Sequence, residues 1–535
     1  MLLVFPSVFI GMFYRFGGGK TPFIWCYSFL HVMLGARNFS YFHLCNCCME
    51  YTLSPLDVKS QNRTRFQMNI LKSIVRVTLS NIVVLISSLV LGFIIPMIIS
   101  LEGYGYYKVF SLYGPYFVLL NLGLIDGVGL KFGDKNYDEL NKEKFRTYFQ
   151  QYLIIHCFFI SILAPLIYIK AKGEYRFIFF GLIINILAVN ITGYFQHISQ
   201  ITQRFKEFSN RKIVQALLNL LIIGLLLLAQ KYTENVTYRL YVMMLIFTNY
   251  LMMFWYSYTY KDLILGKSSS LQSSLLECIE FIKQGFPLVF SYQIATLILS
   301  LDRQFVSILF PTVIYATYAF AYSMLAIIST ATSAVSAVLF PTIKRMNLEN
   351  LKRQYSRIIG LFFVFIFAML SIYFPLTLLI KIILPKYLDS LPIFRIILPG
   401  FVISSSITVI IHNYYKVLEQ NRVYFFKSIV VLAISLIANL IAYSLFKSTN
   451  SISIASVITI FIWFFYFEHH LKRFCQHIGN RHHIYMFVMT SVFYLVSTLD
   501  NYITGFFLYI SLLVIISVIV FNRSLFVTEN NKVIK

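Results

Sequence analysis

The sequence predicts an all-α, polytopic membrane protein, and three observations support this fold class. Of the 535 residues, 58% are hydrophobic and only 12% are charged, and the mean hydropathy is +0.73. A soluble chain of this length has too little interior to bury so much apolar surface. The apolar residues also form segments of about 20 residues, the length at which a helix crosses the hydrocarbon of a bilayer. Short loops separate these segments, so we expect no soluble domain.

The first two segments set a plan that the rest of the chain repeats. One apolar segment runs from Ser80 to Ser100, a polar turn follows at Glu102–Gly105, and a second apolar segment ends near Lys131. Reading the whole chain in this way predicts about fourteen transmembrane helices, at 78–100, 107–130, 147–169, 177–200, 213–230, 240–260, 286–308, 312–340, 357–384, 393–415, 428–446, 452–471, 485–500 and 503–521.

A weak internal repeat suggests how these helices are grouped. Pro96 precedes Tyr104-Gly105-Tyr106-Tyr107, and Pro311 precedes Tyr315-Ala316-Thr317-Tyr318 at the corresponding turn further along. We therefore expect two pseudo-repeated six-helix lobes, 68–262 and 275–471, joined by a small polar linker at 263–274. An extra helix pair and a cytoplasmic tail follow at 472–535. Residues 1–67 differ in character, and we expect an N-terminal extension or a mis-assigned start, with translation beginning at Met68.

The charge pattern predicts the orientation in the membrane. With the start of the first span inside, the inner segments hold 31 of the 45 Lys and Arg residues and the outer segments hold 11. Positively charged loops stay on the cytoplasmic side. Both termini are therefore expected in the cytoplasm, and the net charge of +24 is expected to face anionic lipid rather than nucleic acid.

No cofactor or metal site is expected from the sequence. The seven cysteines and ten histidines show no zinc-site spacing that stands out. The stretch Gly17-Gly18-Gly19-Lys20-Thr21 is similar to a phosphate-binding loop, but Tyr14 occupies the place of the required first glycine. We expect a protein that is not an enzyme.

Several short motifs, in their order and spacing, resemble one family of transporters. They are the turn Tyr104-Gly105-Tyr106-Tyr107-Lys108, the span end Gly123-Leu124-Ile125-Asp126-Gly127-Val128, Gly285-Phe286-Pro287, Asp302-Arg303, Leu339-Phe340-Pro341 with Lys344-Arg345, and Leu384-Pro385-Lys386-Tyr387-Leu388. Over roughly 68–522 the chain resembles the lipid-linked polysaccharide and O-antigen flippases. These form the polysaccharide biosynthesis protein branch of the multidrug/oligosaccharidyl-lipid/polysaccharide exporter superfamily.

The resemblance implies a function. A flippase of this kind moves undecaprenyl-pyrophosphate-linked oligosaccharide units across the bacterial cytoplasmic membrane by alternating access, for O-antigen or capsule synthesis. It implies membrane lipids as surroundings, a polysaccharide polymerase and a chain-length regulator as partners, and coupling to H⁺ or Na⁺. Two alternatives stay open: a membrane polysaccharide polymerase or glycosyltransferase, and a multidrug exporter of the same superfamily. The short outer loops and the few intramembrane carboxylates argue against both.

A polar stripe on the fourth span is a candidate wall for the sugar. Its residues are spaced 7, 4, 3 and 4 apart, which places them on one helical face: Asn185, Thr192, Gln196, Ser199 and Gln203. Polar side chains inside a membrane are frequently functional. The alternative is that they form hydrogen bonds between helices of one lobe.

Four charged or titratable residues are further candidates. Arg303 is predicted to bind the substrate phosphate, because its planar guanidinium suits oxyanions, the alternative being an interfacial anchor. Asp302, Asp126 and His412 are candidates for ion coupling. For Asp126 the competing interpretation is a helix cap or ion pair, and for His412 an interfacial histidine near the cytoplasmic end.

Overall fold

The described part of the chain is helical, which confirms the all-α fold class. The computed structural model describes residues 55–133, 135–232, 237–475 and 480–521, and every regular element in these ranges is an α-, 3₁₀- or π-helix. Most of the predicted extension 1–67 lies outside the described residues, and helix α3 continues on both sides of Met68. Residues 73–522 form one compact unit, and the packing described below lies within it.

The elements before the predicted linker include six long helices or helix pairs. They are α3 (Pro55–Ile98), α4 (Leu101–Tyr113), the 3₁₀-helix η1 (Gly114–Asn121), α5 (Leu124–Phe132), η2 (Tyr137–Glu139), α6 (Lys142–Lys170), α7 (Gly173–Ile201), α8 (Phe205–Tyr232), α9 (Tyr238–Thr259) and η3 (Lys261–Leu263).

The elements after it are more often broken. They are α10 (Leu271–Ile298), α11 (Leu301–Leu309), α12 (Thr312–Met324), α13 (Ala326–Arg345), α14 (Leu348–Met369), η4 (Leu370–Ile372), α15 (Tyr373–Ile383), η5 (Pro385–Tyr387), α16 (Ser390–Ser406), the π-helix η6 (Ile407–Ile411), α17 (His412–Val417), α18 (Asn421–Phe446), α19 (Thr449–Leu471), α20 (Arg481–Val496) and α21 (Tyr502–Phe521).

Twelve of the fourteen predicted spans have a counterpart of bilayer length among the described helices. Among the described residues, ten helices are long and apolar enough to cross a bilayer, or twelve if two bent helix pairs each count as one span. The two predicted spans without a match are helical in the structure. The predicted span 312–340 is divided at Leu325 between α12 and α13, and the predicted span 485–500 corresponds to α20, which has 16 residues.

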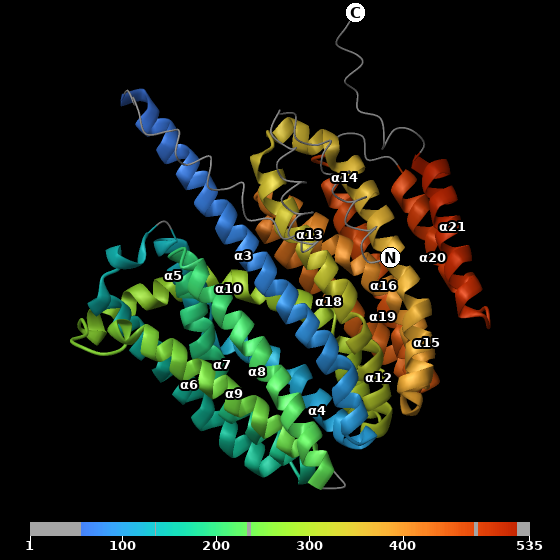
Figure 1. Cartoon of the computed structure of the whole chain (residues 1–535), viewed down its shortest axis with the longest axis horizontal. Helices are drawn as coiled ribbons and strands as arrows, with labels where there is room; N and C mark the ends of the chain where they lie inside the picture. The colour runs from blue at the N-terminus through green and yellow to red at the C-terminus, as the bar shows by residue number, and fades with distance from the viewer. Residues whose placement is uncertain (1–54, 134, 233–236, 476–479, 522–535) are drawn as a thin grey trace, which may run out of the picture. The chain divides into compact units, whose positions relative to one another are not determined.

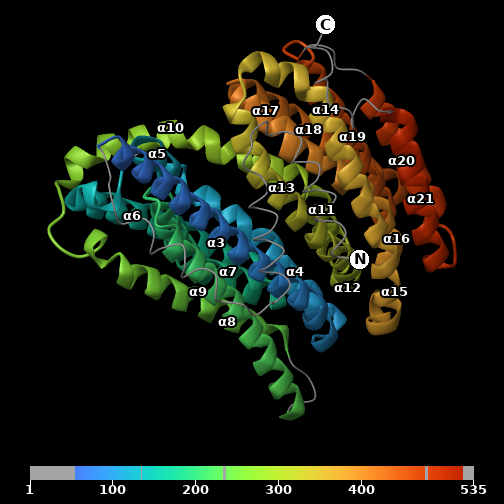
Figure 2. The ribbon, with the colours of Figure 1, turned by 45° about the horizontal axis from the view of Figure 1, so that its top comes forward.

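Two views of the ribbon show how the helices are arranged. Helices α5 to α9 lie side by side in one group, and α14, α16, α19, α20 and α21 lie together in another (Figures 1 and 2). Helix α4 contacts α7 and α9 of the first group, and it contacts α12 and α11, which pack against α16 and α19 of the second group. These contacts link the two groups. The division into two six-helix lobes stays a prediction.

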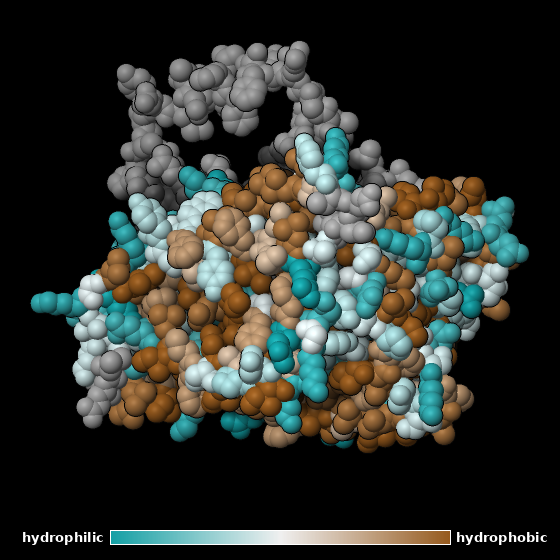
Figure 3. All heavy atoms as spheres, turned by 90° about the horizontal axis from the view of Figure 1, so that it is seen from below, coloured by the Kyte–Doolittle hydropathy of each residue, from teal (hydrophilic) through white to brown (hydrophobic). Residues whose placement is uncertain are grey.

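Apolar side chains cover much of the outside. On α8, Leu217, Leu221 and Leu228 are each more than half exposed. Brown, hydrophobic residues cover much of the face in Figure 3, with hydrophilic residues interspersed. Leaving such area in water would cost about 25 cal/mol per Å², so we conclude that these surfaces face lipid. The protein is a multi-pass membrane protein.

The predicted linker is held in place by helix α6. The Thr147 hydroxyl lies 2.8 Å from the Ser269 hydroxyl, and Arg146 Nη1 donates to the Lys267 carbonyl at 2.7 Å. Further along, Lys144 Nζ pairs with a carboxylate oxygen of Glu277 on α10 at 2.7 Å. The first half of α10 is therefore tied to α6, although it follows the linker in sequence.

Candidate translocation site

Two bent helix pairs contact each other. The pair Leu101–Asn121 and Leu124–Phe132 bends by 57°, and the pair Ser274–Ile298 and Leu301–Leu309 also bends by 57°. The first pair touches the second at its break: the Tyr116 hydroxyl of η1 lies 2.5 Å from the Ser300 hydroxyl, and Gln304 Nε2 donates to the Tyr116 hydroxyl at 2.5 Å. Backbone groups freed at a break inside a membrane need partners, so breaks are places where polar side chains gather.

Asp302 begins the short helix after the second break and is buried. Its side chain is 2% exposed, and one carboxylate oxygen accepts hydrogen bonds from the hydroxyls of Tyr318, at 2.7 Å, and Tyr322. The other oxygen accepts the backbone N–H of Arg303 at 2.7 Å. The three hydrogen bonds compensate for the lost hydration of a carboxylate. They also fix α11 against α12.

Arg303 is half-buried beside Asp302, and its guanidinium still has donor capacity. Nη2 donates to the Leu299 carbonyl at 3.0 Å, and the guanidinium carbon lies 4.5 Å from the centre of the Tyr322 ring. Nε is buried and has no hydrogen-bond partner among the described residues. A buried N–H without a partner costs about 1–3 kcal/mol. An oxyanion ligand at this position would remove that cost.

A second cation comes from the other bent span. Lys108 of α4 is half-buried, and its ammonium lies 5.2 Å from the ring of Tyr104 and 5.3 Å from that of Tyr107. Its backbone carbonyl accepts the Tyr315 hydroxyl at 3.2 Å, and α4 contacts α11, which carries Arg303. Sequence reasoning named Lys108 only as part of a motif and assigned it no role in binding. The signal that could have found it is the lysine directly after the tyrosine-rich turn 104–107.

Helices α4 and α12 pack closely beside this site. A Cβ on Gly105 would lie 2.5 Å from the carbonyl oxygen of Thr312, so the two backbones are too close for a side chain there. The Tyr104 hydroxyl lies 3.1 Å from that of Ser323. Lys386 Nζ donates to the Ile99 carbonyl at 2.8 Å, which joins the end of α3 to η5. These contacts link the two groups of helices at the end where α3 stops and α4 begins.

The polar stripe predicted on the fourth span is split in the structure. Asn185 accepts from Asn249 Nδ2 of α9 at 2.9 Å, and the Ser199 hydroxyl lies 2.7 Å from that of Tyr260. Thr192 is buried, and its hydroxyl has no partner among the described residues; Gln196 is half-buried. Helix α7 ends at Ile201, so Gln203 lies beyond it, exposed and with a φ of 57°. The helical face therefore stops before Gln203, because the chain turns toward α8 there.

The other two candidates for ion coupling lie on separate elements. Asp126 is half-buried in the first turn of α5, where a carboxylate suits the helix dipole. His412 opens α17 directly after the π-helical turn η6, and its ring stacks on that of Tyr424 with 4.6 Å between centres. Both roles stay predictions.

Sequence reasoning missed a buried network on α6 and α7. The Tyr152 hydroxyl donates to Asn121 Oδ1 at 2.6 Å, His156 Nε2 lies 3.1 Å from the same oxygen, and Asn190 Nδ2 lies 2.9 Å from His156 Nε2. All four side chains are buried. The signal that could have found it is the histidine and the asparagine in the middle of long apolar segments.

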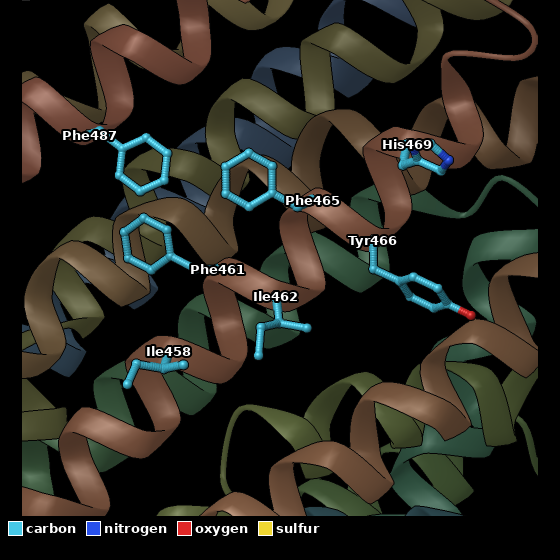
Figure 4. Close-up of a pocket in the computed structure, with 7 residues that line it drawn as sticks. All are labelled: Ile458, Phe461, Ile462, Phe465, Tyr466, His469 and Phe487. Atoms are coloured by element: carbon cyan, nitrogen blue, oxygen red, sulfur yellow. The ribbon is translucent and has the colours of Figure 1, made fainter.

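An apolar groove on the surface of α19 lacks the chemistry to bind a polar headgroup. The rings of Phe461, Phe465 and Phe487 lie together along it (Figure 4). The residues that line it are Ile458, Phe461, Ile462, Phe465, Tyr466, His469 and Phe487. Such a surface suits a hydrocarbon chain, so the polar region of the two bent spans is the candidate site.

Comparison with known protein families assigns the chain to one of them. The family described as polysaccharide biosynthesis protein matches residues 70–347, which is more than half of the sequence and includes both bent spans. The chain belongs to this family. No curated protein matches the sequence.

Solved structures share the fold of this polysaccharide biosynthesis protein at low identity. The inward closed conformation of the lipid II flippase MurJ is 14% identical and has a TM-score of 0.64, covering 85% of this chain and 100% of its own. An inward-facing multidrug resistance MATE family transporter of the MOP superfamily is also 14% identical, with a TM-score of 0.52, covering 75% of this chain and 98% of its own. The chain therefore has the fold of these transporters, as the sequence motifs predicted.

Proposed function

We propose that this protein is a transporter that flips lipid-linked oligosaccharide units, joined to the lipid through pyrophosphate, across the membrane. The observation that carries the proposal is Arg303, a half-buried guanidinium whose Nε has no partner among the described residues. Pyrophosphate is a dianionic oxyanion group, and the planar fork of arginine binds such oxygens in a bidentate manner. Membership in the polysaccharide biosynthesis protein family supports a sugar-containing cargo.

Lys108 and the tyrosines around both cations support the same assignment. In hydrocarbon, an unpaired phosphate has nothing to replace its hydration, so a path for it needs fixed cations and hydroxyl donors. Lys108 supplies a second positive charge from α4, and the rings of Tyr104, Tyr107 and Tyr322 lie against the two cations. Because the cations lie on two separate bent spans, relative movement of these spans would change access to both, as alternating access requires.

The finer parts of the proposal follow from the sequence. The membrane is the bacterial cytoplasmic membrane with both termini in the cytoplasm, the product serves O-antigen or capsule synthesis, and a polymerase and chain-length regulator act next. Asn185, Thr192, Gln196, Ser199 and Gln203 would face the sugar. Coupling to H⁺ or Na⁺ would use Asp302, Asp126 or His412, of which Asp302 has the largest set of hydrogen bonds.

The structural likeness to a multidrug transporter favours a second candidate function. Export of small organic cations calls for a carboxylate that the cargo can reach. In this chain Asp302 is 2% exposed and already bonded to two tyrosines, whereas Arg303 retains an available donor. The site therefore suits an anionic cargo better than a cationic one.

Arg303 provides the test of the proposed function. In a flippase-null strain, Arg303→Ala should lower surface polysaccharide at least tenfold, which corresponds to losing one charge-assisted hydrogen bond of about 1.5–3 kcal/mol. Arg303→Lys should give an intermediate level, because it keeps the charge and loses the fork. Protein amounts are checked by blot, and the exposed Arg176→Ala is the matched control. Normal polysaccharide from well-expressed Arg303→Ala would refute the phosphate contact, and resistance to cationic drugs in place of polysaccharide would favour the second candidate.

A further inference from the structure

A cluster of two histidines and a glutamate lies far from the candidate translocation site in sequence. Glu468 ends α19, and His482 and His483 begin α20. His482 Nε2 lies 2.7 Å from one carboxylate oxygen of Glu468, and His483 Nε2 contacts the other. One ligand atom from each of the three residues can be chosen so that all lie within 4.8 Å of one another.

The cluster is buried and supported by neighbouring helices. The side chains of Glu468, His482 and His483 are 1%, 2% and 12% exposed. The Tyr355 hydroxyl of α14 donates to Glu468 Oε1 at 3.0 Å. Aromatic rings pack against the imidazoles: Phe363 against His482, and Phe464 and Phe465 against His483. The arrangement is thus held by three helices in a largely dry, aromatic shell.

We propose that Glu468, His482 and His483 bind a divalent transition metal, zinc being the ion that this ligand set suits best. Two imidazole nitrogens and one carboxylate oxygen are a common three-residue zinc set, which leaves a fourth position for water. Ligand atoms in a tetrahedral zinc site are about 3.3 Å apart, so small side-chain shifts are enough. Binding needs the free electron pair of each Nε2, and a proton held there moves to Nδ1 or leaves to solvent. Tyr355 would orient the Glu468 carboxylate through its hydrogen bond, as donors that contact a metal ligand but not the metal do in other sites.

The location of the site indicates what the metal would do. Glu468 belongs to α19 and both histidines to α20, and α20 packs against α21 and α14. A metal would therefore fasten the C-terminal helix pair to the helices before it, across the connection that includes 476–479. Its effect is expected on stability rather than on cargo binding, because none of its ligands contacts the cations of the two bent spans.

Metal content and thermal unfolding of the full chain in detergent test the proposal. After chelation, titration with Zn²⁺ should load about one ion per chain by mass spectrometry, and the midpoint of thermal unfolding should rise, reversibly on chelation. Mg²⁺ should have no effect, because it prefers oxygen ligands. Glu468→Gln and the double variant His482→Ala/His483→Ala should lose the bound zinc, and Tyr355→Phe should bind it about tenfold more weakly. The exposed neighbour His469→Ala is the matched control and should keep the ion.

Cobalt gives a measurement that does not depend on folded variants. Co²⁺ bound by the wild-type chain should show the visible absorption of a four-coordinate ion, and Zn²⁺ should displace it. The proposal is overturned if the wild-type chain binds no more Zn²⁺ than the double variant, or if Co²⁺ gives only the spectrum of the hydrated ion. Either result would leave the cluster as a hydrogen-bonded structural contact.

Discussion

The two bent spans turn through the same angle, 57°, but are stabilised in different ways. At the first break, Leu122 and Gly123 have φ of 49° and 79°, and Oδ1 of the preceding Asn121 accepts the Tyr152 hydroxyl. The backbone of Gly123 also packs against that of Gly285 on α10. At the second break, Asp302 is bonded to tyrosines of α12, and Arg303 keeps a donor without a partner among the described residues.

We propose that this difference separates a structural break from a functional one. Polar groups inside a membrane that are fully bonded to one another stabilise a conformation. A buried polar group with a donor that has no partner raises the free energy of the folded protein, and a ligand that accepts this hydrogen bond removes the cost. On this criterion we propose that the first bend shapes the span and that the second presents Arg303 to the cargo.

The largest effect on stability is expected at Gly123. Its Cβ would collide with the backbone of Gly285 on α10, and its positive φ disfavours any other residue. Gly123→Ala should lower the free energy of unfolding by about 4 kcal/mol, combining overpacking with backbone strain. Thermal unfolding in detergent measures the change. Gly224→Ala on α8, where a Cβ meets nothing within 4 Å, is the control and should be neutral or stabilising. Equal midpoints for the two variants would show that the first bend does not depend on this contact.

The next effect concerns the network behind the first bend. His156→Leu removes the hydrogen-bond acceptor of Asn190 in a buried region, which should cost about 2 kcal/mol. Flipping by the protein that remains folded should stay near the wild-type rate. The adjacent Cys157→Leu, on an exposed position, is the control for unfolding. A flipping rate that falls tenfold at equal protein amounts would contradict the structural role assigned to this bend.

At the second bend we expect a small effect on stability and a large effect on flipping, the reverse of the first bend. Asp302→Asn keeps an oxygen for the tyrosine hydroxyls, so the free energy of unfolding should change by only about 1 kcal/mol. Flipping should fall at least tenfold, because the charge beside Arg303 is lost and a bound ion would lose its carboxylate. Polysaccharide output and thermal unfolding are measured on the same preparations, with the exposed Asp138→Asn as control. If Asp302→Asn flips its cargo at the wild-type rate, the proposal that the second bend is functional and the first structural is refuted.

The smallest effect is expected on α7. Asn185→Ala removes one hydrogen bond to Asn249, and such bonds between membrane helices average about 0.6 kcal/mol. If Asn185 only joins α7 to α9, polysaccharide output should be unchanged and the unfolding midpoint slightly lower. If it faces the sugar, output should drop with no change in the midpoint. Comparing Asn185→Ala with Asn249→Ala decides the matter, since a purely structural bond predicts the same result for both.

The sequence by itself determined the membrane class, the all-helical fold and the family. These follow from apolar segments of bilayer length and from ordered short motifs, which are properties of local sequence. It also selected Asp302 and Arg303, because adjacent charges within an apolar segment stand out.

Only the tertiary structure decided which polar residues lie together. Lys108 and Arg303 are 195 positions apart in sequence, and nothing in either segment indicates that α4 and α11 contact each other. The same holds for Tyr355 and Glu468, and for the divided stripe on α7, where the helix ends before Gln203. Helical periodicity fixes which residues share a face of one helix, whereas the packing of the whole bundle fixes what that face meets.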